Sequence, residues 1–198
     1  MGGRGNTGTT RQPAISSLIL DEDLSSAWSE DPELYQNLSD PERADKYIAQ
    51  MKRDGWEDEE IKEVQELANQ IRDLSESQTV KDTNTLYRGE RFSNLADAQK
   101  KYQVGSVIHN TQLTSYATDK ETATEYATMY QGTAVIITNT NKAGNFVGVR
   151  TDHYGTGGDS EVITPKGLRS VVKSTRYDKK KNILYVTMEN TATPRRKR

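Results

Sequence analysis

The spacing of apolar residues changes partway along the chain, and the first part has a helical period. Between residues 34 and 74, apolar side chains recur three and four positions apart, as on one face of an α-helix. Gly55 divides this region, so the pattern predicts two helices, the first starting at residues 39–41. Their apolar stripes predict a helical cap that packs on the rest of the domain. The stripes consist of Ala44, Tyr47, Ile48 and Met51, followed by Ile61, Val64, Ala68, Ile71 and Leu74.

After residue 85 the pattern changes to short β-rich runs separated by turn residues. Two short helices interrupt these runs, one over 95–102 and one opening with a capping box at 118–121. Helices grouped first and strands after them, without alternating βαβ units, predict an α+β domain with two packed, mainly antiparallel sheets. The predicted strands are 85–89, 104–108, 112–117, 133–138, 145–149, 160–164, 170–177 and 182–189.

The two ends of the chain differ in composition from its middle. Residues 1–30 open with a glycine-rich segment and predict a flexible arm, and residues 191–198 form a basic tail. The 198 residues suffice for one domain, predicted over 31–190. Within it we expect a helical cap over 31–78 and a β-rich core over 79–190.

Charge and composition exclude several kinds of function. The formal net charge of -2 gives no overall reason to expect binding to nucleic acid or a membrane, although the basic tail leaves a weak nucleic-acid contact open beside a solvated extension. The absence of cysteine excludes disulfides and cysteine-based zinc sites, and two histidines are too few for a histidine-rich metal site, so no metal is expected. With neither a long apolar run nor the apolar core of a signal peptide, a cytoplasmic protein is expected.

Two strand segments carry candidate binding residues. Arg88 offers a planar fork of donors that suits a pyrophosphate, and Gly89 beside it permits close backbone approach. Thr114 and Ser115, next to Tyr116, can hold a ribose or nicotinamide by hydrogen bonds and stacking. Taken alone, Arg88 is more often a surface residue at the end of a strand, and Thr114 and Ser115 are more often ordinary strand hydroxyls.

A third segment places two carboxylates close together. Asp159 and Glu161 are two residues apart, so on an extended strand both project from one face. Such a pair suits glycosidic chemistry, in which one carboxylate supports an oxocarbenium-like centre and the other handles the proton of the nucleophile. The glycine-rich run 155–158 precedes them and is expected to form a loop over a substrate. The alternative is a hairpin loop followed by an edge strand with ordinary charges.

The order of the three segments resembles that of the R-S-E class of ADP-ribosyltransferases, a family of bacterial toxin and phage enzymes. The resemblance runs from about residue 86 to 189. It includes the lysine-glycine turn at 142–146 and the apolar run and turn at 162–167, and the helical cap matches the lobe that such enzymes place before their first strand.

The resemblance implies a role for each candidate residue. Arg88 would bind the NAD phosphates with Gly89 beside it, and Ser115, with Thr114, would orient the cofactor. Glu161 would be the catalytic acid that bonds the ribose 2′-hydroxyl, Asp159 would contact the acceptor, and Tyr154 would help to recognise it. One departure is that Ala117 replaces the second serine of the family's S-T-S motif.

The same resemblance implies an activity and its partners. It predicts transfer of ADP-ribose from NAD to a protein side chain, with arginine the leading acceptor, and release of nicotinamide. NAD would bind between the sheets, and the acceptor would be a bacterial host protein. The opening Gly2-Gly3-Arg4-Gly5 also resembles some phage head-associated proteins, which leaves a virion-associated protein open. The alternatives are an NAD glycohydrolase and a non-catalytic phage structural or interaction protein with this fold.

Overall fold

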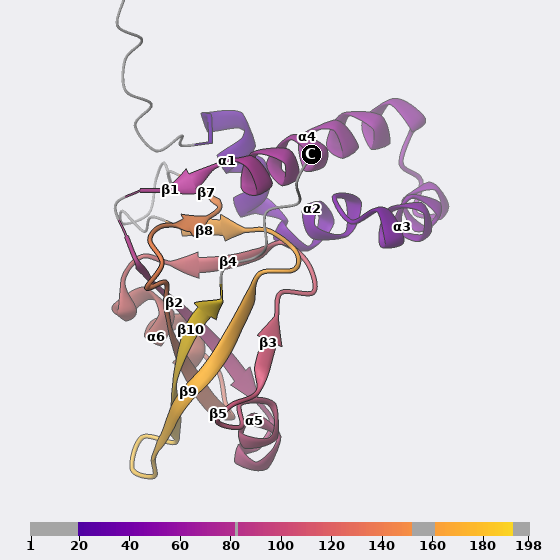
Figure 1. Cartoon of the computed structure of the whole chain (residues 1–198). Coiled ribbons are helices and arrows are strands. Elements are labelled where there is room, and N and C mark those ends of the chain that lie inside the picture. The colour runs from indigo at the N-terminus through magenta and orange to yellow at the C-terminus, as the bar shows by residue number, and fades with distance from the viewer. Residues whose placement is uncertain (1–19, 82, 152–160, 192–198) are drawn as a thin grey trace, which may run out of the picture.

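A computed structural model describes residues 20–81, 83–151 and 161–191. The chain first forms a group of helices and then a β-rich region (Figure 1). The helices are α1 (Glu22–Glu30), α2 (Pro32–Leu38), α3 (Pro41–Arg53), α4 (Asp58–Ser77), α5 (Leu95–Lys101) and α6 (Lys120–Thr128). The strands are β1 (Thr79–Val80), β2 (Thr85–Phe92), β3 (Val107–His109), β4 (Thr114–Ala117), β5 (Thr133–Thr140), β6 (Phe146–Val147), β7 (Val149–Thr151), β8 (Glu161–Thr164), β9 (Arg169–Asp178) and β10 (Ile183–Thr191).

Helices α1–α4 form a helical lobe, and local sequence accounts for the two predicted helices within it. The Asp40 carboxylate accepts the backbone N–H of Glu42 and caps α3, and Gly55 follows its end with a φ of +93°. A capping box between Glu57 and Glu60 starts α4. The predicted helical cap is therefore confirmed.

The expectation of a flexible arm over residues 1–30 was wrong for residues 20–30. This segment contains helix α1, and Leu20, Leu24 and Trp28 are buried in the core of the helical lobe. The backbone N–H of Leu20 also donates to the carbonyl of Arg150 on β7 at 2.8 Å. The spacing of the three apolar residues gives one narrow helical stripe, which the polar residues around it obscured. Residues 1–19 and 192–198 lie outside the described residues.

The strands form two mainly antiparallel sheets, as predicted. One has eight strands in the order β3-β9-β10-β5-β2-β4-β8-β7, and the other pairs β1 with β6. Within the larger sheet β10 and β5 are parallel, while the remaining neighbours are antiparallel.

The larger sheet divides into two parts at the contact between β2 and β4. These strands share a single registered pair, Tyr87 opposite Ala117. In Figure 1, β4 and β8 run across the direction of β9 and β10. The side chains between the two parts form a core cluster, so the eight strands behave as two packed layers joined along one edge. That cluster contains Val80, Leu86, Tyr116, Phe146, Val162 and Leu168.

Helices cover both parts of the larger sheet. The helical lobe packs on β4, β7 and β8 through Leu113, Val149 and Ile163. Helices α5 and α6 cover opposite faces of β5, because Val135 and Ile137 share a cluster with α5, whereas Ala134 and Ile136 share one with α6.

Two local predictions differ from the structure. Helix α6 is capped by Asp119, which accepts the N–H of Thr122, and the predicted cap at Thr118 lies one residue too early. The predicted strand over 145–149 is split at Gly148, whose φ is +156°. Its two pieces join different sheets as β6 and β7.

We predict that Trp28→Ala destabilises the domain by about 3–5 kcal/mol, because it empties a fully buried site in the core of the helical lobe. Urea unfolding measures the loss. Trp56→Ala is the matched control, because that side chain is 40% exposed and should cost far less. A loss at Trp28 as small as that expected at Trp56 would show that α1 is not part of the core.

Candidate functional site

Arg88 connects the two parts of the larger sheet. It lies on β2, with its side chain 31% exposed, and its Nη1 donates to the carbonyl oxygen of Ser115 on β4 at 2.6 Å. Its Nε donates to Oε1 of Glu90 at 3.2 Å. The structure thus brings together Arg88 and Ser115, which are separated by 27 residues in sequence.

Glu90 fixes the Arg88 side chain through the hydrogen bond to its Nε. This residue was not among the predicted site residues. Its other carboxylate oxygen accepts from Nζ of Lys101 at 2.8 Å and from the hydroxyl of Tyr102 at 2.7 Å. Burial opposes ionisation, but the charges of Arg88 and Lys101 outweigh it and hold the pKa of Glu90 below its ordinary value. Spacing offered a signal, because residues 88 and 90 of one strand face the same side.

Ser115 and Glu161 lie on one face of neighbouring strands. In the β4–β8 ladder, Ser115 is opposite Ile163 and Ala117 is opposite Glu161. Ser115 and Glu161 are therefore diagonal neighbours, roughly 7–8 Å apart, and both are half-buried. The face they share continues beneath the helical lobe, since Ile163 belongs to its core.

Two other predicted site residues, Thr114 and Gly89, make contacts away from Ser115 and Glu161. Thr114 faces away from Ser115 by strand alternation, and its hydroxyl donates to the carbonyl of Gln112 at 2.9 Å. Gly89 supports packing, because a Cβ there would lie 2.1 Å from the carbonyl oxygen of Ala123 on α6. The absence of a side chain at Gly89 thus permits the close approach of helix α6. Asp159 and Tyr154 lie outside the described residues.

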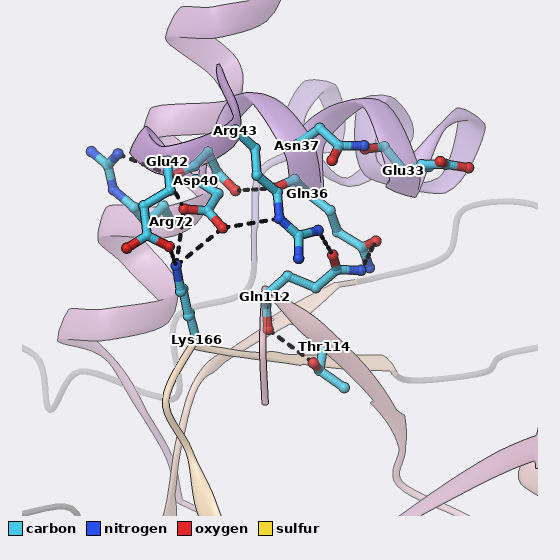
Figure 2. Close-up of polar contacts among 11 residues, drawn as sticks. Glu33, Gln36, Asn37, Asp40, Glu42, Arg43, Arg72, Gln112, Thr114 and Lys166 are labelled. Atoms are coloured by element: carbon cyan, nitrogen blue, oxygen red, sulfur yellow. Dashed lines mark hydrogen bonds and ion pairs between the residues drawn. The ribbon is translucent and has the colours of Figure 1, made fainter. Parts of the chain in front are cut away.

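A polar cluster, formed by Asp40, Arg43, Gln112 and Lys166, ties the helical lobe to the strands of the site (Figure 2). Nζ of Lys166, in the turn after β8, lies 3.0 Å from Oδ1 of Asp40. Nη1 of Arg43 donates to Oε1 of Gln112, just before β4, at 2.6 Å. The helices therefore fix the strand that carries Ser115 at its start and the strand that carries Glu161 at its end.

Burial and charge act in opposite directions on Asp40, the centre of the polar cluster. Its side chain is 3% exposed, and burial alone would raise the carboxyl pKa. Hydrogen bonds from Lys166 and from the Glu42 backbone, with the charge of Arg43, lower that pKa below its ordinary value. This cluster could not be predicted from the sequence, because its members come from segments far apart in the chain.

Within the three described stretches, no group of three or more histidine, cysteine or acidic residues could hold a metal ion. None of the helices in these stretches is both long and apolar enough to cross a membrane.

Comparison with known proteins identifies the fold. No family model and no curated protein sequence matches the chain. The structure is similar to that of the ADP-ribosyltransferase Vis of Vibrio splendidus in complex with agmatine, with a TM-score of 0.58 and 14% identity over 92% of this chain and 80% of that one. For the ATR domain of Salmonella SpvB the values are 0.53 and 18%, over 87% of this chain and 100% of that one. The C3larvin toxin of Paenibacillus larvae, an ADP-ribosyltransferase, gives 0.50 and 11%, over 87% and 86%. The predicted ADP-ribosyltransferase fold is therefore confirmed.

We predict that Glu90→Gln flattens the dependence of stability on pH in the acid range. The folded-state pKa of Glu90 lies below its ordinary value of 4.5, so its ionised form stabilises the fold above that pH. The contribution is lost as the pH falls through the folded-state pKa. Thermal melts from about pH 7 to pH 3 should show a less stable variant at neutral pH with a smaller loss on acidification.

Glu63→Gln serves as the control for this experiment, because Glu63 is exposed on α4 and forms no ion pair within the described residues. It should keep the parent's pH dependence. If Glu90→Gln keeps it as well, the charges around Glu90 do not stabilise the folded state.

Proposed function

We propose that this protein is an NAD-dependent mono-ADP-ribosyltransferase that modifies an arginine side chain of a protein. The observation that carries the proposal is the convergence of Arg88, Ser115 and Glu161 from three strands of an ADP-ribosyltransferase fold. Arg88 bonds the backbone of Ser115, and Glu161 lies diagonally beside Ser115 on the adjacent strand.

Arg88 has the chemistry to bind the NAD phosphates. A guanidinium carries five N–H donors, and among the described residues two of them are used, for Glu90 and Ser115. The remaining donors suit phosphate oxygens, and the Glu90 and Ser115 contacts fix the plane of the fork before the cofactor arrives. Binding then costs less side-chain entropy than it would for an unrestrained arginine.

Glu161 acts on the nicotinamide ribose. The bond between C1′ of the ribose and the nicotinamide nitrogen breaks, nicotinamide leaves with the electron pair, and positive charge develops at C1′. The Glu161 carboxylate accepts a hydrogen bond from the 2′-hydroxyl and stabilises that charge. A nitrogen of the acceptor guanidinium then forms the new bond to C1′ and releases a proton, for which Asp159 is the base.

The choice of arginine as acceptor rests on two observations. The solved structure of Vis contains agmatine, whose guanidinium group has the chemistry of an arginine side chain. Asp159 supplies a carboxylate two residues before Glu161, and a carboxylate matches a guanidinium in charge and in hydrogen-bonding geometry.

We predict that Glu161→Gln lowers nicotinamide release from NAD by about 10²- to 10⁴-fold, because the amide keeps the size of the side chain but loses its negative charge. Release is measured with NAD labelled in the nicotinamide ring. Glu63→Gln, on the exposed face of α4, is the matched control and should release nicotinamide at the parent's rate. A Glu161→Gln protein that melts like the parent and keeps its rate would refute the assignment.

We predict that Asp159→Ala separates transfer from hydrolysis. Loss of the acceptor's base should reduce ADP-ribosylation of agmatine or a protein acceptor by about 10²-fold or more, whereas water needs less assistance and nicotinamide release should persist in part. Mass spectrometry of the acceptor and nicotinamide release are followed in one reaction. A parent protein that releases nicotinamide without modifying any acceptor would instead be an NAD glycohydrolase, and an Asp159→Ala variant with normal transfer would place acceptor recognition elsewhere.

A further inference from the structure

Glu161 has a cross-strand neighbour on each side, and the two differ in chemistry. On β4 its partner is Ala117, which has no polar side-chain atom. On β7 its partner is Thr151, which carries a hydroxyl. Directly opposite residues of antiparallel strands project from the same face, with Cβ atoms about 4.5–5.5 Å apart. Of the two residues directly opposite Glu161, Thr151 is thus the one that can donate a side-chain hydrogen bond.

The hydroxyl of Thr151 is in an unusual state. The residue is 0% exposed, and its Oγ1 has no hydrogen-bond partner among the described residues. A buried hydroxyl without a partner is costly, and such groups in folded proteins usually have a functional or structural explanation. A carboxylate accepts hydrogen bonds from several directions, so the side chain across the ladder can supply the missing acceptor.

We propose that Thr151 is a positioning residue for Glu161: its hydroxyl donates to the Glu161 carboxylate and holds it in the orientation needed at the ribose. This inference rests on the proposed function, because it assigns the orientation of the carboxylate that would stabilise the charge at C1′. Thr151 acts through Glu161 and does not contact NAD. β7 is fixed for this role by its pairing with β8 and by the bond from Leu20 to Arg150.

Thr151→Val and Thr151→Ser separate the hydroxyl from the shape of the side chain. Valine keeps the volume and removes the donor, so kcat for nicotinamide release should fall about tenfold or more while KM for NAD changes little. Serine keeps the donor and should retain most of the parent's kcat. Thr133→Val is the matched control, because Thr133 is also buried and its hydroxyl bonds Asn182, but it lies on β5, three strands away from β8.

A second measurement does not depend on turnover. A hydrogen bond to a carboxylate changes the shielding of its carbon, so Thr151→Val should shift the carbon-13 resonance of the Glu161 side-chain carboxyl. Carbon-13 NMR of the side-chain carboxyls at neutral pH detects this change, with the Glu161→Gln variant assigning the resonance. Thr133→Val should leave that resonance unchanged.

The outcomes distinguish the inference from the proposed function. A parent protein that neither binds nor cleaves NAD refutes the function, while the carboxyl resonance still tests the contact between Thr151 and Glu161. A Thr151→Val variant with the parent's kcat and the parent's Glu161 carboxyl resonance overturns the inference. Equal losses of kcat in Thr151→Val and Thr151→Ser also overturn it, because they would show that keeping the hydroxyl does not preserve the rate.

Discussion

The site depends on a junction where the sheet has little backbone pairing of its own. β2 and β4 meet through one registered pair, so the ladder contributes few hydrogen bonds there. The bond from Arg88 to the Ser115 carbonyl supplies a further, charge-assisted link across this seam. Arg88, the residue expected to bind substrate phosphate, thus also holds the two layers together. Glu90 keeps Arg88 in place and is itself bonded by Lys101 of α5 and by Tyr102, which follows that helix.

The helical lobe stabilises the same region from the other side. Its apolar residues cover the face that carries Ile163, and its polar residues hold Gln112 and Lys166, which flank the two strands of the site. The Lys166 side chain is 42% exposed, so solvent screens its ion pair with Asp40 and the pair adds only modest net stability. Its value is geometric, because a buried carboxylate with specific donors permits one placement of the lobe over β4 and β8. Removing Lys166 would leave the buried Asp40 carboxylate with Arg43 and the Glu42 N–H as its remaining partners.

Much of the fold could be predicted from the sequence, because the spacing of apolar residues is regular in elements that bury only one face. Helices α3 and α4 each have one apolar stripe, and β5 is a continuous apolar run flanked by turns. Helix α1 was missed because three apolar residues among serines and acids form a weak pattern. The split of residues 145–149 depends on Gly148, whose neighbours already include the carbonyl of Ile163, a contact that only the tertiary structure defines.

The candidate residues were found through the order of three short motifs, yet the groups that support them were not. Lys166 owes its importance to Asp40, 126 residues away in sequence, whereas Glu90 and Thr151 depend on partners that only the packing of neighbouring elements defines. The register of β7 on β8 places Thr151 opposite Glu161. The alternation of side chains along each strand does not define which residues of two strands face each other.

The position of β10 has a consequence for how the protein folds. This strand lies between β9 and β5, and its parallel pairing with β5 joins segments that are far apart in the chain. Hairpin pairing of β9 with β10 can form locally, but the larger core cannot close until that hairpin docks on β5. Non-local pairing of this kind slows folding, so one edge of β5 stays unpaired until β10 arrives. Closure of this core therefore waits for the synthesis of the β9–β10 hairpin.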